Sequence, residues 1–279
     1  MIRVGPAVAC APAKLNLFLE VTGKRPDGYH ALETLMLAVN LFDTLELADD
    51  PTGRIGLVCE PEGLPTDERN LAYRAAQKFA PRGARMRLTK RIPHEAGLGG
   101  GSSDAATVLQ MRGGTPAMAA DLGSDVAFFF HAPAAWCTGR GEMVEPESPG
   151  GRFDFVVVKP AGGLSTAEVY RHLKLPSASR SGDAARAALR RGSPEELAGG
   201  LFNRLEAAAC DLSPAVADVI QRLRRCEPLA VQLTGSGSAV FALCRNGTDA
   251  DRVAVQFRAS WPSGEVLPRV YVVRSWPRG

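Results

Sequence analysis

"GLGGGSSDAA" occupies positions 97–106, directly after "RMRLTKRIPHEA". The alternation of apolar residues before it predicts a strand over 86–92, and the helix-forming residues after its glycines predict a helix over 103–111. A flexible linker is not normally tied into regular structure at both of its ends. This context therefore excludes a linker and leaves a shaped loop between a strand and a helix.

The composition of this loop favours an anion-binding site. Its glycines, at positions 97, 99, 100 and 101, allow positive φ angles and a close approach of backbone N–H groups to a ligand. Ser102 or Ser103 is expected to cap the following helix, whose first N–H groups carry partial positive charge. Together these features predict a phosphate cradle. A tight structural turn is the alternative, although such a turn rarely needs four glycines.

The spacing excludes the commonest nucleotide motifs. A Walker A loop ends in Gly-Lys-Ser/Thr, and this loop contains no lysine. The dinucleotide fingerprint requires glycine or alanine where Ser102 stands. The H-R-D and D-F-G motifs of protein kinases are also absent from the sequence.

The bulk composition is that of a soluble globular protein. The 279 residues are 45% hydrophobic and 23% charged, which suits one large domain or two ordinary ones. Arginine supplies 27 of the 33 basic residues, but 30 acidic residues are interspersed and the net charge is only +3, which favours an ordinary solvated surface. The six cysteines form no C-x-x-C pair and are expected to be reduced thiols. We see no signal peptide and no spanning segment, so we expect a cytoplasmic protein.

The order of elements predicts a mixed α/β chain in two halves. The best boundary candidate is "VEPESPGGRFD", residues 144–154, which is rich in proline, glycine and charge. The strands expected most strongly are "PAKLNLFLEVTG", "TLMLAVNLFDTLELAD", "FDFVVVKP" and "RVYVVRSW", and "LAVQLTGSGSAVFALC" is expected to form two strands joined by a glycine turn. Helices are expected over 67–80, from Thr166 to His172, within 181–205, and over 214–225 with Ser213 as its cap.

Several segments together resemble the GHMP kinases. "PHEAGLGGGSSDAA" is similar to the phosphate-binding motif of that superfamily, and "PAKLNLFLEVTGKRPDGYH" and "LTGSGSAVFAL" agree with it in order and spacing. With "LGSDVAFFF" and "LSTAEVYRHL", the resemblance is greatest to the 4-diphosphocytidyl-2-C-methyl-D-erythritol kinase family, over nearly the whole chain.

The resemblance implies an α+β two-domain GHMP kinase fold. Residues 1–150 would form an N-terminal domain that resembles domain 2 of ribosomal protein S5 and carries the phosphate loop. Residues 151–279 would form a ferredoxin-like C-terminal domain. The implied partner is a small-molecule substrate, with no nucleic acid and no membrane, and the implied assembly is a monomer or a homodimer.

The activity that the resemblance implies is ATP-dependent phosphorylation of the 2-hydroxyl of 4-diphosphocytidyl-2-C-methyl-D-erythritol, a step of non-mevalonate isoprenoid precursor biosynthesis. The implied ATP-binding residues are Pro93, His94, Glu95, Ala96, Gly97, Leu98, Gly99, Gly100, Gly101, Ser102 and Ser103. Mg²⁺ would be held mainly by the ATP phosphates, with Ser103 as a possible protein ligand.

Two charged residues are the candidates for catalysis. Asp125 is an isolated acid before an apolar run, so its side chain is expected to be half-buried and to need a cationic partner. A carboxylate that accepts the hydroxyl proton is typical of general-base catalysis. Lys14 stands alone on an apolar strand, which an edge or outward-facing position would also explain. The resemblance assigns Lys14 as the partner of Asp125.

The expected substrate-binding residues come from both halves of the chain. They are Asn16, Tyr29, His30, Thr166, Tyr170, Gly235, Ser236 and Gly237. Asn16 lies two residues from Lys14 and therefore on the same face of the strand. The resemblance implies that Tyr29 and His30 recognise cytosine, with Tyr170 on the other side of the base. Structural roles are the ordinary alternatives for a lone histidine and for a glycine turn.

Two features depart from the family pattern. His94 to Ala96 stand where the family has methionine and small residues, and a carboxylate at Glu95 is unfavourable beside phosphate unless it points away or pairs with Arg91. The segment after the loop helix is also short, which puts the wall of the nucleotide site in doubt. The alternatives are another GHMP kinase, of the mevalonate or homoserine type, and a non-catalytic nucleic-acid-binding relative.

Overall fold

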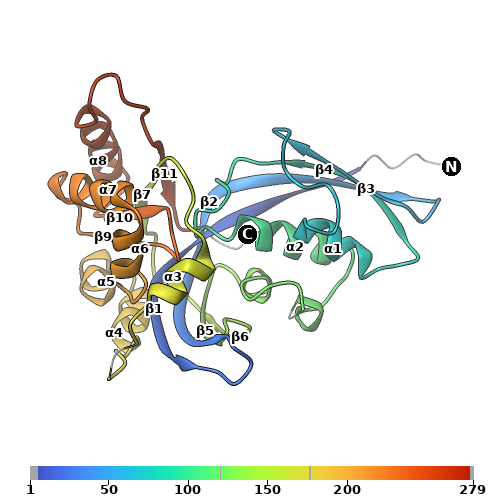
Figure 1. Ribbon diagram of the computed structural model, residues 1–279, viewed down its shortest axis with the longest axis horizontal. Coiled ribbons are helices and arrows are strands. Elements are labelled where there is room, and N and C mark those ends of the chain that lie inside the picture. The colour runs from blue at the N-terminus through green and yellow to red at the C-terminus, as the bar shows by residue number, and fades with distance from the viewer. Residues whose placement is uncertain (1–5, 120, 176, 277–279) are drawn as a thin grey trace.

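The structure, a computed structural model, describes residues 6–119, 121–175 and 177–276. Two sheets form its framework, one of seven strands and one of four. Figure 1 shows the larger sheet extending toward the N-terminus, with the smaller sheet and its helices at the opposite end. The predicted mixed organisation in two parts is confirmed.

A long hairpin is the centre of the larger sheet. β1 (Ala7–Lys24) and β2 (His30–Asp50) are antiparallel, and Gly28, at φ 86°, turns the chain between them. The other strands are β3 (Ile55–Glu60), β4 (Gly83–Thr89), β5 (Ala134–Gly139), β6 (Met143–Glu147) and the short β8 (Phe202–Asn203). One face is covered by α1 (Leu71–Gln77) and α2 (Gly100–Met111), with the 3₁₀ turns η1 (Pro116–Ala119) and η2 (Ala127–Phe130) beside them.

The smaller sheet is buried on both faces. Its order is β11 (Arg269–Arg274), β7 (Asp154–Lys159), β10 (Val240–Cys244) and β9 (Ala230–Leu233), all antiparallel. Val156 and Val158 face a core made with α6 (Glu206–Leu212), α7 (Pro214–Arg225) and α8 (Gly247–Ala259). Ser213 caps α7 by accepting from the Val216 N–H, which confirms the predicted start of this helix.

The other face of the smaller sheet packs on the hairpin. Phe155 and Phe241 lie in one apolar cluster with Leu15 and Leu37, and α4 (Asp183–Arg191) and α5 (Pro194–Gly200) complete it. Glu147 on β6 accepts from two arginines of α4, Arg186 and Arg190. The Gly150 N–H donates to the Leu189 carbonyl, so the segment around residue 150 also packs against α4. The domain boundary at residue 150 stays a prediction.

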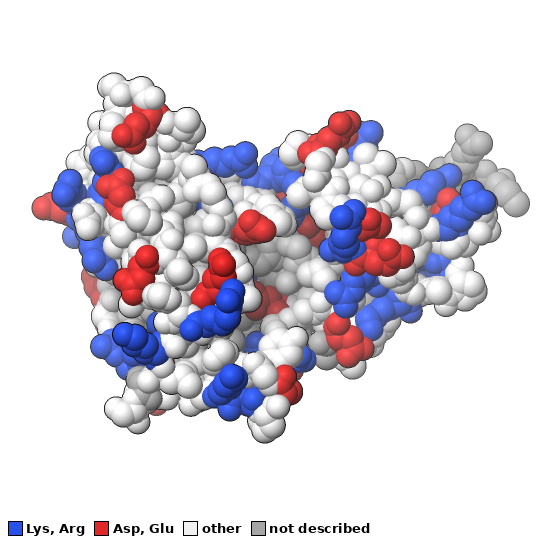
Figure 2. All heavy atoms as spheres, in the orientation of Figure 1, with Lys and Arg blue, Asp and Glu red and all other residues white. Residues whose placement is uncertain are grey.

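The molecular surface mixes charges of both signs. Figure 2 shows acidic and basic side chains interspersed over the face drawn. Within the described residues, the helices are all too short or too polar to cross a membrane.

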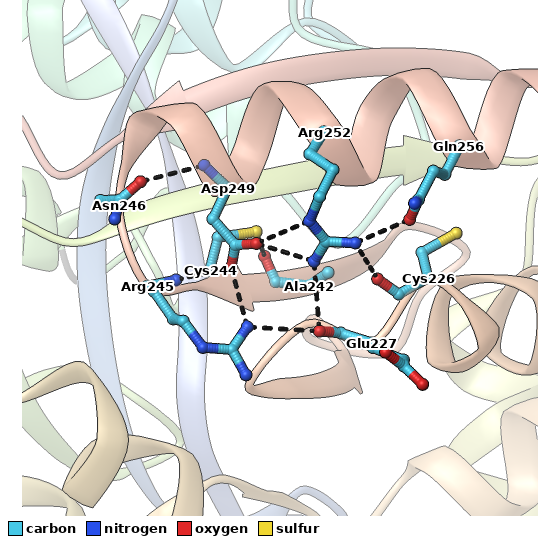
Figure 3. A network of polar contacts seen from close by, with 9 residues as sticks. All are labelled: Cys226, Glu227, Ala242, Cys244, Arg245, Asn246, Asp249, Arg252 and Gln256. Atoms are coloured by element: carbon cyan, nitrogen blue, oxygen red, sulfur yellow. Dashed lines mark hydrogen bonds and ion pairs between the residues drawn. The ribbon is translucent and has the colours of Figure 1, made fainter.

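A polar network fastens α8 to the smaller sheet (Figure 3). Asn246 caps α8, and the Asp249 carboxylate accepts from the Arg245 N–H and from the Arg252 guanidinium. Both arginines also donate to the Glu227 carbonyl. Burial alone would raise the pKa of Asp249, but these donors outweigh it, and the pKa is lowered. Asp249 is therefore more stable as a carboxylate in the folded chain than in the unfolded chain.

Several predicted helix limits are wrong. The helix expected over 67–80 is confined to Leu71–Gln77, because Asn70 caps it and residues 78–82 form turns. The helical stretch expected over 181–205 breaks into α4 and α5, since Gly192 adopts φ 71°, and it ends in β8. The helix α3 (Thr166–His172) has the predicted limits.

Candidate active site

The glycine loop joins the two parts of the molecule. Gly97 and Gly99 have φ angles of 73° and 71°. A Cβ on Gly97 would lie 2.1 Å from the Thr234 carbonyl oxygen, and a Cβ on Gly99 would lie 2.9 Å from Cγ of Lys14. Both positions therefore require glycine, for backbone conformation and for space.

The loop leads directly into α2. The helix begins at Gly100, and its N-cap is Gly99, which has no side chain to bond the first turn. The predicted capping by Ser102 or Ser103 is wrong, because both serines already lie inside the helix. Gly100 and Gly101 likewise belong to the helix rather than to the left-handed part of the loop. By helix geometry the first N–H groups of α2 have no acceptor within the helix, which suits them to bind an anion.

A cavity of about 410 Å³ lies over this loop. Ten of the eleven residues expected to bind ATP line it, namely Pro93, His94, Glu95, Ala96, Gly97, Leu98, Gly99, Gly100, Gly101 and Ser102. Ser103 does not line it. Its hydroxyl is fully buried and has no hydrogen-bond partner among the described residues. Leu64, Pro65 and Asn70 form part of the wall.

A buried charge cluster at the edge of this cavity was not predicted. Lys90, just after β4, bonds the carboxylates of Asp43 on β2 and Asp104 on α2. Asp43 also accepts from the N–H groups of Arg91 and Ile92. Burial raises the pKa of Asp104 to about 7, against the opposing charge of Lys90. Asp43 and Asp104 are isolated charges in mainly apolar segments, but Lys90 lies in an arginine-rich stretch beside Arg91, so the sequence did not single it out.

The position of Glu95 shows how a carboxylate is accommodated beside the glycine loop. Its side chain is 62% exposed, and a Cβ on Gly163 would lie 2.3 Å from its Oε2, so the carboxylate lies against the segment that follows β7. Arg91 instead donates to Thr44, and Nδ1 of His94 lies 3.9 Å from Oε1 of Glu95. Glu95 therefore makes no pair with Arg91.

Lys14 and Asp125 meet beside the loop. Nζ of Lys14 lies 3.4 Å from Oδ2 of Asp125 and donates to the Gly97 carbonyl at 2.8 Å. Lys14 is 3% exposed, so the outward-facing alternative is wrong. The same ammonium bonds Oδ1 of Asn16, whose amide donates to Thr34. Asp125 is 29% exposed and can contact a ligand.

A larger cavity, of about 1140 Å³, opens between the two parts. Both expected catalytic residues and all eight expected substrate-binding residues line it: Lys14, Asn16, Tyr29, His30, Asp125, Thr166, Tyr170, Gly235, Ser236 and Gly237. Glu95, Gly97 and Gly99 line both cavities. The glycine loop is thus a wall common to the two, and Lys14 lies against that wall.

Aromatic side chains form one end of the larger cavity. The rings of His30 and Tyr170 stack with 4.9 Å between centroids and 25° between planes. The hydroxyls of Thr166 and Ser236 lie 2.8 Å apart beside them. Burial, with a smaller contribution from Lys24, lowers the pKa of His30, which favours its neutral imidazole.

Comparison with known sequences gives two family matches. The family model described as "GHMP kinases N terminal domain" matches residues 70–112, and "GHMP kinases C terminal" matches residues 185–263. The 4-diphosphocytidyl-2-C-methyl-D-erythritol kinase of Pelotomaculum thermopropionicum is 40% identical over 267 residues, covering 90% of this chain and 93% of the relative. The enzyme of the same name from Bacillus subtilis is 37% identical, covering 87% and 90%.

Solved structures agree with the sequence matches. A crystal structure of 4-(cytidine 5'-diphospho)-2C-methyl-D-erythritol kinase superposes with a TM-score of 0.79 at 35% identity, over 97% of this chain and all of the other. A homoserine kinase from Cytophaga hutchinsonii superposes with a TM-score of 0.76 at 17% identity, over 98% and 95% of the two chains, which shows a shared fold. The chain therefore belongs to the GHMP kinases, in the 4-diphosphocytidyl-2-C-methyl-D-erythritol kinase family.

Proposed function

We propose that this chain transfers the γ-phosphoryl group of ATP to the 2-hydroxyl of 4-diphosphocytidyl-2-C-methyl-D-erythritol. The observation that carries the proposal is the Lys14–Asp125 pair at the wall between two cavities. Phosphoryl transfer needs a donor and an acceptor on opposite sides of one reacting centre, in line with each other. ATP in the smaller cavity and the alcohol in the larger one would meet at Gly97 and Gly99.

The loop supports the assignment of ATP to the smaller cavity. Glycine backbone and the free N–H groups of α2 suit phosphate oxygens, and the helix dipole adds about 0.3–1 kcal/mol for each exposed anionic site. The chain's membership of the GHMP kinases implies ATP as phosphate donor.

Mg²⁺ is proposed as part of the nucleotide complex. In the described residues, the acidic, histidine and cysteine side chains form no group of three or more that would hold a metal. Mg²⁺ in kinases is commonly held by substrate phosphates with few protein ligands, and its positive charge offsets charge on the phosphates. The unpartnered hydroxyl of Ser103 fits such a role chemically, but its side chain lines neither cavity, so contact requires the loop to shift.

In this proposal Asp125 and Lys14 have different catalytic roles. Asp125 accepts the proton of the attacking hydroxyl, a role that contributes about 10²–10⁴-fold. Lys14 attracts the carboxylate by about 5 kcal/mol at 3.4 Å and an effective dielectric near 20, before desolvation. Its other bonds, to Gly97 and Asn16, tie the ammonium to the loop, so it also lies near the transferring group.

The aromatic end of the larger cavity is the proposed site of the cytosine. A base between two rings needs about 7 Å between them, twice the carbon–carbon contact distance. The 4.9 Å between His30 and Tyr170 is too short. The two rings therefore have to separate for the base to bind between them.

A coupled ADP-release assay tests the proposal. The chain is supplied with ATP and, separately, with 4-diphosphocytidyl-2-C-methyl-D-erythritol, mevalonate, homoserine and galactose. We expect turnover of the first alone. Turnover of one of the others, with none of the first, would move the chain's activity to that sister kinase.

A further inference from the structure

Among the described residues, one cation that lines the larger cavity lies over an aromatic ring of the proposed substrate site. The basic side chains that line this cavity, histidine aside, are Lys14, Lys24, Arg140 and Arg171. Lys14 is committed to Asp125, Lys24 lies exposed at the end of β1, and Arg171 is 76% exposed beside Glu168. Arg140, in the turn between β5 and β6, remains.

The side chain of Arg140 is held in place while its donors stay free. Its guanidinium carbon lies 4.9 Å from the centroid of the Tyr29 ring, and the side chain is 29% exposed. Its Nε forms an ion pair with Oε1 of Glu142 at 3.8 Å, which is beyond hydrogen-bond distance. Within the described part of the chain, this guanidinium donates no hydrogen bond to the protein. A stacked guanidinium with free donors is arranged for a bidentate anion.

The position of Arg140 lies between the two ends of the cavity. On one side it covers Tyr29, at the aromatic end. On the other side, a Cβ on its neighbour Gly141 would lie 3.8 Å from Oδ1 of Asp125, at the reacting end. In the proposed substrate a diphosphate joins the cytidine to the alcohol that is phosphorylated. The anionic group would therefore pass the guanidinium.

We propose that Arg140 binds the diphosphate of the substrate and so selects a nucleoside diphosphate conjugate over a neutral alcohol. This inference rests on the proposed function. The cavity already contains the carboxylates Asp125 and Glu95, and two further negative charges are costly to bury without a cation. Arg140 supplies that cation on the acceptor side only, because it does not line the smaller cavity.

Calorimetric titration with CDP and with cytidine tests the inference. The full-length chain is first saturated with a non-hydrolysable ATP analogue, so that CDP is confined to the larger cavity. We expect Arg140→Gln to weaken CDP binding about 10- to 100-fold, the range for a lost charge-assisted contact, and to leave cytidine binding within about 2-fold. Arg140→Lys should fall between, because it keeps the charge and loses the planar fork. Arg85→Gln, at an exposed arginine of β4 that lines neither cavity, is the matched control and should change neither affinity.

Steady-state kinetics on the same variants distinguish a wrong role for Arg140 from a wrong proposed function. We expect the KM for the acceptor to rise in Arg140→Gln while the KM for ATP is unchanged. Equal weakening of CDP and cytidine would overturn the inference, since Arg140 would then only support Tyr29. Unchanged affinities would overturn it as well. A wild-type chain that phosphorylates only mevalonate, homoserine or galactose would overturn the proposed function and the inference with it, whereas the first two results leave the proposed function intact.

Discussion

Asp104→Asn should change how the stability of this protein depends on pH. Asp104 is 3% exposed, shares Lys90 with Asp43, and keeps one oxygen, Oδ1, without a partner in the described structure. Burial raises its pKa to about 7, Lys90 opposes that rise, and Asp43 adds to it. Asparagine keeps the shape of the side chain and removes the titration.

The direction in which pH changes this stability follows from proton linkage. The pKa of Asp104 is about 7 in the folded chain and 3.8 for an unperturbed aspartate, so between these pH values the folded chain holds a proton that the unfolded chain releases. Its contribution to stability is complete below the unfolded pKa and is lost as pH rises through the folded one. The free energy of unfolding therefore falls by about 1.4 kcal/mol for each pH unit over this interval. Between pH 5 and 7 the loss amounts to about 2–3 kcal/mol.

Urea denaturation of the two proteins at pH 5, 6, 7 and 8 measures this difference. The free energy of unfolding of Asp104→Asn minus that of wild type should rise by about 2–3 kcal/mol from pH 5 to 7 and then level off. Titratable groups distant from Asp104 cancel in that difference. Asp251→Asn, at an exposed aspartate of α8, is the matched control. A difference that stays constant with pH would refute the reasoning.

Three further substitutions test other parts of the account. Asp249→Asn should lower the free energy of unfolding at pH 7 by about 1–3 kcal/mol. Because the pKa of Asp249 is lowered, urea denaturation should show this loss shrinking as pH falls below about 4. A loss that persists there would contradict the network in Figure 3. Tyr170→Ala should raise the KM for the acceptor about 10-fold and leave the KM for ATP unchanged, because base stacking contributes about 1–3 kcal/mol. Equal changes in the two KM values would exclude the proposed stacking of Tyr170 on the base. Gly97→Ala places a Cβ 2.1 Å from the Thr234 carbonyl oxygen and should raise the KM for ATP. Gly56→Ala, on β3 outside both cavities, adds a Cβ with nothing within 4 Å and serves as control; similar KM values for the two variants would contradict the loop geometry.

Sequence patterns correctly predicted the helices and strands that depend on neighbouring residues alone. The start of α7 follows from a serine cap and a proline at its first turn, and the strand–loop–helix order around Gly97 follows from residue periodicity and glycine content. The serine capping of α2 failed because the cap rule assumes that the helix starts at the serines. Glycine at position 99 adopts the left-handed conformation, and the helix starts one residue later.

Contacts between distant segments were beyond the sequence patterns. The cluster of Lys90, Asp43 and Asp104 depends on the packing of β2, β4 and α2, and no spacing rule joins those three positions. The stack of His30 on Tyr170 likewise depends on how α3 approaches the hairpin. Sequence reasoning named both residues for the same base but did not predict that their rings stack on each other.

The most direct test of the central claim is the rate of phosphoryl transfer in Asp125→Asn, measured in a single turnover by rapid quench at saturating ATP and 4-diphosphocytidyl-2-C-methyl-D-erythritol. The account predicts a rate at least about 100-fold below that of wild type, with a folded protein and unchanged affinity for both ligands. A variant that kept more than about a tenth of the wild-type rate would contradict the role of Asp125 as the base, and with it the reacting centre placed at the wall between the two cavities.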